Sequence, residues 1–103
     1  MPPGAGVPAA PNESWIRGRV VSVRAAPGGT GAAWEIELTE SRAEGSMADL
    51  ARSRIGARIT LYVHPGLRLR PRKGTTVEAR VRFQGDETGG AFFVLGQDAR
   101  VVR

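Results

Sequence analysis

The segment 67–74, LRLRPRKG, contains the residues of this chain that are best suited to binding an anion. Its four cations, interleaved with two leucines, are Arg68, Arg70, Arg72 and Lys73. An arginine can hold a phosphate through two parallel hydrogen bonds and can also stack on a ring. In an extended segment, alternate side chains point to opposite sides. We therefore expect an arm that packs through Leu67 and Leu69 and presents its cations to phosphate groups. The alternative is a solvated connection between two strands.

A second candidate feature is a tyrosine among cations on a predicted strand. In ARITLYVH, three aliphatic residues alternate with polar ones, which places Tyr62 on the same face as Arg58. In TVEARVRF, the same alternation turns Arg80 and Arg82 outward. Bases of single-stranded nucleic acid stack on aromatic rings, because every base has a π-face. The residues predicted to bind such a ligand are Arg58, Tyr62, Arg68, Arg70, Arg72, Lys73, Arg80 and Arg82.

Several of these residues also have a purely structural interpretation. Tyr62 can cover the flank of the fold with its hydroxyl in water. Arg80 and Arg82 can pair with acidic residues on neighbouring strands, and such pairs contribute little each. Phe92 and Phe93 are adjacent in a predicted strand, so they point to opposite faces. One of the two is therefore expected outside the core, where it either packs under another segment or is free to stack.

The charge of the chain is concentrated in its centre. The net charge is +5, and residues 41–82 hold ten cations against three acids. This asymmetry favours a polyanionic partner. The alternative is a solvated surface in a protein of arginine-rich composition, since fourteen of the fifteen cations are arginine.

The sequence offers little for catalysis or metal binding. It has no cysteine and a single histidine, His64, which stands beside Pro65. Two carboxylates on one strand face, Glu35 and Glu37, would need burial or a further partner to act as an acid–base pair. No phosphate-binding glycine loop and no cluster of metal ligands is present in the sequence. We expect neither an enzyme nor a bound cofactor or metal.

The chain is expected to fold as one domain after a flexible tail. Residues 1–14 hold four prolines and mostly small side chains, too little to bury for an ordered structure. Strands are predicted in WIRGRVVSVR, where Gly18 marks a bulge or a sharp curl, and in WEIELTE. A glycine-rich connection, residues 25–33, joins them. Residues 41–56 carry the one predicted helix, with Ser46 as its cap and Asp49 three residues later.

The second half of the chain predicts further strands. ARITLYVH, TVEARVRF and AFFVLGQ each favour a strand, and ARVVR is a short last strand or a continuation. Five or six short strands with one short helix predict an all-β protein, a small antiparallel barrel that covers residues 15–103.

This pattern resembles the OB-fold, the oligonucleotide- and oligosaccharide-binding domain. The resemblance rests on the curled strand WIRGRVVSV, the glycine-rich hairpin, and KGTTVEARVRFQG followed by DETGGAFFVL. It implies a five-stranded barrel that binds nucleic acid between the first and fourth hairpin loops. One departure is visible, because the predicted helix precedes the third strand and the family's helix follows it. An SH3-like barrel is the nearest rival.

Three functional hypotheses follow from these features. The first is a module that binds single-stranded DNA or RNA with weak sequence specificity. The second is a protein-interaction or structural barrel that docks through the leucines of the arm or through Phe92. The third is an exported or lipid-anchored domain, with the tail as a spacer. No apolar run is long enough to span a membrane, and a cytoplasmic location is expected unless a signal has been removed.

Overall fold

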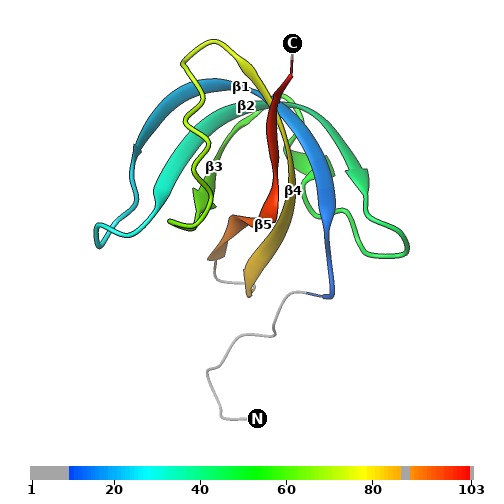
Figure 1. Cartoon of the computed structure of the whole chain (residues 1–103). Coiled ribbons are helices and arrows are strands. Elements are labelled where there is room, and N and C mark those ends of the chain that lie inside the picture. The colour runs from blue at the N-terminus through cyan, green and yellow to red at the C-terminus, as the bar shows by residue number, and fades with distance from the viewer. Residues whose placement is uncertain (1–9, 87–88, 103) are drawn as a thin grey trace.

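A computed structural model of the chain describes residues 10–86 and 89–102, and it is an all-β protein (Figure 1). The five strands are β1 (Ser14–Ala25), β2 (Ala32–Ala43), β3 (Arg58–Val63), β4 (Thr76–Asp86) and β5 (Gly89–Val102). ARVVR continues β5 and forms no separate strand. The strands form a closed barrel in the order β1-β2-β3-β5-β4. The prediction of an all-β protein that forms a small, OB-like barrel of five strands is confirmed.

The curl of β1 allows the barrel to close. β1 pairs along its whole length with β2, and its first six residues also pair with β4. The register between β1 and β2 shifts at Arg17 and Gly18, as the glycine predicted. A Cβ atom at Gly18 would lie 2.6 Å from the Ile36 side chain and 2.8 Å from the carbonyl oxygen of Glu37. Only a residue without a side chain lets the two strands approach this closely.

The contact between β3 and β5 corrects the expectation of a purely antiparallel barrel. Leu61 pairs with Phe92 and Tyr62 with Phe93 in parallel register. The other neighbouring strands are antiparallel. A closed ring of five strands cannot alternate direction throughout, so one neighbouring pair must run parallel.

The inward side chains follow the predicted alternation. Trp34, Ile36 and Leu38 of β2 have no exposed surface. Val77 and Val81 of β4 are each 1% exposed. The alternation of apolar and polar residues therefore predicted the core face of these strands correctly.

The predicted helix at 41–56 is reduced to one 3-10 turn, η1 (Arg52–Arg54). Asp49 does not serve a longer helix. Its Oδ1 accepts hydrogen bonds from the hydroxyls of Ser14 (2.7 Å) and Ser41 (2.6 Å) and from the backbone N–H of Arg52 (3.1 Å). These contacts tie the β2–β3 connection to β1 and β2, and residues 41–43 of the predicted helix are part of β2, paired with β1.

The β3–β4 connection is the arm that the sequence predicted. It is irregular from His64 to Thr75 and crosses the barrel as the yellow-green segment of Figure 1. Leu67 and Leu69 pack against the core, whereas Arg68 and Arg70 are exposed. The arm covers the barrel as an extended segment, where the OB resemblance implied a helix.

Residues 10–13, which composition assigned to the tail, lie against the barrel. Asn12 is 5% exposed, donates through Nδ2 to the carbonyl of Phe83 (3.0 Å) and accepts from the N–H of Phe83 (2.8 Å). The backbone of Glu13 is hydrogen-bonded to Ala48 and Glu44. We call residues 10–13 the strap. The rest of the predicted tail, residues 1–9, lies outside the described residues.

Within the ranges 10–86 and 89–102, no helix has the length and apolar character needed to cross a membrane.

Candidate functional site

An aromatic pair lies on the outer face of the barrel where β3 meets β5. The ring centroids of Tyr62 and Phe93 are 5.6 Å apart, and the planes are inclined by 34°. Phe93 is 36% exposed, whereas its neighbour Phe92 is 5% exposed and packs edge-on against Phe83. The prediction that one of the two phenylalanines stands outside the core is confirmed. Phe93 joins Tyr62 because parallel pairing sets their side chains on one face.

A hollow of about 510 Å³ opens beside this pair. The β1–β2 loop forms its opposite wall with Pro27, and His64 and Pro65 form its end. The Nε2 atom of His64 lies 2.7 Å from the carbonyl oxygen of Gly96. The hollow is therefore lined by two aromatic rings and by a histidine that is hydrogen-bonded to β5.

A second and larger cleft, of about 770 Å³, separates the end of β1 from the arm. Arg24 stands on the β1 side, and Arg68 and Arg70 stand on the arm. Among the described residues, none of these three arginines forms an ion pair. We call this feature the basic cleft. It also borders on His64 and Pro65, so the basic cleft and the aromatic hollow share one wall.

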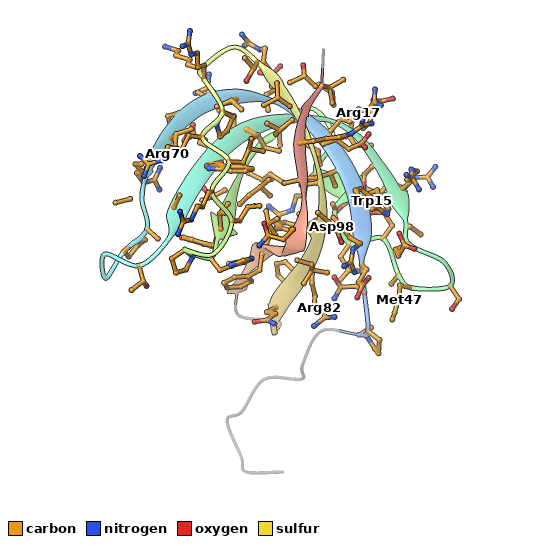
Figure 2. The ribbon with its side chains drawn as sticks, viewed as in Figure 1. Trp15, Arg17, Met47, Arg70, Arg82 and Asp98 are labelled. Atoms are coloured by element: carbon orange, nitrogen blue, oxygen red, sulfur yellow. The ribbon has the colours of Figure 1, made fainter. Side chains whose placement is uncertain are left out.

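Arg80 and Arg82 have different surroundings from the arginines of the arm. Glu13 in the strap pairs with both, at 2.8 Å from Arg80 and 2.9 Å from Arg82. Asp98 lies 2.6 Å from Arg80. The hydrogen bond from Arg82, followed by that from Arg80, lowers the pKa of Glu13 below its ordinary value. In Figure 2, Arg70 lies at one edge of the barrel, far from Arg82 and Asp98.

The acids that pair with the arginines of this face lie on neighbouring strands and in the strap, as the structural interpretation expected. Glu78, on β4, pairs with its register partners, Arg17 on β1 (2.8 Å) and Arg100 on β5 (3.2 Å). Its hydrogen bond from Arg17 is the main cause of its lowered pKa. The outward cations of β4 are thus held within ion-pair networks, and a phosphate would have to displace a carboxylate to reach them.

Arg58 lies at the far end of β3 from the arm, among acids. Its Nη1 is 3.7 Å from Glu35, and its register partner on β2 is Glu37. Arg54 and Arg58 line a small hollow together with Tyr62. Arg58 is thus paired with an acid of β2 and is separated from the arginines of the arm.

The two remaining predicted cations, Arg72 and Lys73, are exposed at the turn before β4. They line neither the aromatic hollow nor the basic cleft. The structure thus brings Arg68 and Arg70 close to the end of the face that carries Tyr62, and it separates Arg72 and Lys73 from it.

Arg24 is the residue of the basic cleft that the sequence pattern missed. It ends the strand sequence VVSVR, where alternation alone gave it no special role. Its position depends on the arm returning past the end of β1, a tertiary contact without a local signal.

Trp15 offers no second stacking platform. The guanidinium of Arg42 lies over its ring, 5.6 Å from the centroid. Its indole N–H donates to the carboxylate of Glu44. The Arg42 guanidinium covers a face of the ring that a base would need.

No group of three or more His, Asp or Glu residues that could hold a metal ion occurs in the part of the chain that the structure describes. Comparison of the chain with protein-family models, curated proteins and solved structures finds no match in any of the three.

Proposed function

We propose that the protein binds single-stranded nucleic acid through the Tyr62–Phe93 pair and the adjoining basic cleft, as an OB-fold domain with weak sequence specificity. The observation that carries the proposal is the shared wall of His64 and Pro65, which joins an exposed aromatic pair to three arginines that have no acidic partner among the described residues. The five-stranded barrel and its β1–β2 loop support the assignment to the OB-fold.

In this proposal, one base stacks on Phe93 and Tyr62 in the aromatic hollow. The following phosphates pass His64 and reach Arg68 and Arg70, whose forked guanidinium groups bind phosphate oxygens in pairs. A single strand is favoured over a duplex because its bases are free to stack on protein rings. Stacking and phosphate contacts do not distinguish one base from another, which gives the weak specificity.

The test is a fluorescence anisotropy titration of the purified protein with labelled single-stranded DNA, single-stranded RNA and duplex DNA, at low and at moderate salt. We expect saturable binding of a single strand that weakens as salt increases. The double variant Arg68→Ala with Arg70→Ala should lose most of this affinity. The double variant Arg72→Ala with Lys73→Ala removes the same charge from outside the basic cleft and should keep more of it.

Absence of binding at low salt to all three nucleic acids would refute the proposal. Equal losses from the two double variants would show that net charge alone attracts the ligand and that the basic cleft is not the site.

A further inference from the structure

Among the residues that the structure describes, the second half of β1 has no strand partner along one of its edges. The pairing of β1 with β4 ends at Arg19, and the backbone of Val20 is bonded to Gly74 and Thr75. Beyond that point, residues 22–25 pair with β2 on one side. On their other side, no backbone hydrogen bond joins residues 21–25 to any part of the chain that the structure describes. Such an edge presents a row of N–H and C=O groups that can pair with another strand.

The facing wall of the basic cleft is also extended backbone with free hydrogen-bonding groups. The arm makes backbone hydrogen bonds at Leu67 and then again from Arg72 to Thr75. Within the described residues, the backbone of residues 68–70 makes none. The cleft of about 770 Å³ between these two walls is therefore lined on both sides by backbone that can pair with an extended chain.

The side chains around the cleft define the chemistry of an occupant. Arg24, Arg68 and Arg70 surround it and have no acidic partner among the described residues. Val23 is 41% exposed at the β1 edge, and Leu67 contributes a partly buried apolar surface. Alternate residues of a strand point to opposite faces, so a peptide with alternating acidic and apolar side chains matches both kinds of surface.

We propose that the basic cleft binds an extended acidic peptide of a partner protein, which adds as a strand to the free edge of β1. Main-chain hydrogen bonds to β1 supply affinity, and the three arginines select acidic side chains. A nucleic-acid strand can satisfy the arginines, but it lacks the regular alternation of donors and acceptors that an open strand edge offers. This inference goes beyond the nucleic-acid function. Because both ligands use Arg68 and Arg70, the two should compete.

The test compares two labelled peptides by fluorescence anisotropy with the full chain. The first alternates aspartate and valine. The second has the same acidic residues, but proline replaces alternate valines, so it keeps the charge and loses the N–H groups needed for strand pairing. We expect the first to bind at least about tenfold more tightly, as the loss of one or two backbone hydrogen bonds predicts. Hydrogen exchange should show new protection at residues 21–25 when it binds.

Protein variants provide the controls for the peptide test. Replacing Arg24, Arg68 and Arg70 by alanine should abolish peptide binding, whereas Arg72→Ala with Lys73→Ala should largely keep it. The variant Phe93→Ala should keep peptide binding in full, because its side chain lies in the aromatic hollow. Retained peptide binding in a protein that binds no oligonucleotide would support this inference and refute only the nucleic-acid function.

Equal affinity for the two peptides would overturn the proposal, since charge alone would then explain binding. Protection of residues 21–25 that increases with protein concentration in the absence of peptide would also overturn it. That result would identify a second copy of the chain as the occupant of the edge.

Discussion

Tyr62 and Phe93 stand directly opposite each other on two strands that are far apart in sequence and run in the same direction. Their ring centroids are 5.6 Å apart on the outer face, while their neighbours Leu61 and Phe92 fill the core beneath them. The parallel seam of the barrel therefore places an aromatic pair where a base can reach it.

Replacing Phe93 by alanine should weaken the binding of single-stranded oligonucleotide by about tenfold or more, because base stacking contributes about 1–3 kcal/mol per base. Tyr62→Ala should have a similar effect. Tyr62→Phe keeps the ring and serves as the matched control, with nearly unchanged affinity. Anisotropy titrations at one fixed salt concentration measure these differences. An alanine variant that binds as well as the parent protein would exclude the aromatic pair from the site.

The salt dependence of binding should report the number of phosphate contacts. Each contact with a single strand contributes about 0.7 to the slope of log affinity against log salt concentration. Removal of both Arg68 and Arg70 should therefore reduce the slope by about 1.4. Removal of both Arg80 and Arg82 should leave it almost unchanged, because Glu13 and Asp98 already neutralise them. The opposite ranking would place the phosphate path on β4.

The strap should contribute to stability through Asn12. Asn12→Ala leaves the N–H and the carbonyl of Phe83 without their partners, and unpaired buried groups cost about 1–3 kcal/mol. Asn12→Asp keeps an acceptor for the N–H and should lose less. Urea unfolding measures the change in the free energy of unfolding. Parent-like stability of Asn12→Ala would show that the strap contributes nothing to the fold.

Gly18→Ala adds only one methyl group, but it should lower the free energy of unfolding markedly. The added Cβ would lie 2.6 Å from Ile36 and 2.8 Å from backbone of Glu37, and overpacking of this kind costs about 1–3 kcal/mol. Gly66→Ala is the matched control, since its Cβ would meet only the side chain of His64, at 3.1 Å. Thermal and urea unfolding compare the two variants. A larger loss at Gly66 would contradict the close approach of β1 and β2.

Stability should fall in acid below the ordinary carboxyl pKa of 4.5. The pKa values of Glu13 and Glu78 are lowered in the folded protein by arginine hydrogen bonds. The unfolded chain then binds protons more readily than the folded protein does. The stabilisation is complete above about pH 4.5 and is lost as the pH falls through the lowered values. Glu78→Gln should make the decline shallower when the free energy of unfolding is measured against pH.

The sequence allowed prediction of the features that depend on local alternation. Trp34 and the alternate residues that follow it on β2 were expected to face the core. Phe92 and Phe93 were expected to point to opposite faces, and the leucines of the arm were expected to point inward. Each of these follows from the two-residue repeat of extended chain. The bulge was predictable from a glycine inside a strand sequence, and the barrel from the number of short strands.

Features that depend on which strands are neighbours could not be predicted. Glu13 lies in a stretch that composition assigned to the tail, yet the pairing of β1 with β4 brings it to Arg80, 67 residues away. Asp49 matched a helix-capping pattern, but it also accepts a hydrogen bond from the hydroxyl of Ser14, 35 residues away. The arginines of the basic cleft and the ion-paired arginines of β4 therefore looked alike in sequence, because strand order decides which arginines meet a carboxylate.

The seam between β3 and β5 is only two residue pairs long, although it closes the whole barrel. Short ladders open before long ones, so local opening of this barrel is expected to begin between Leu61 and Phe92. A base stacked across Tyr62 and Phe93 would bridge the two strands from the outside. It could bind fully only while the seam is shut. Ligand binding and barrel closure are then thermodynamically linked, and a bound ligand reduces local opening between β3 and β5.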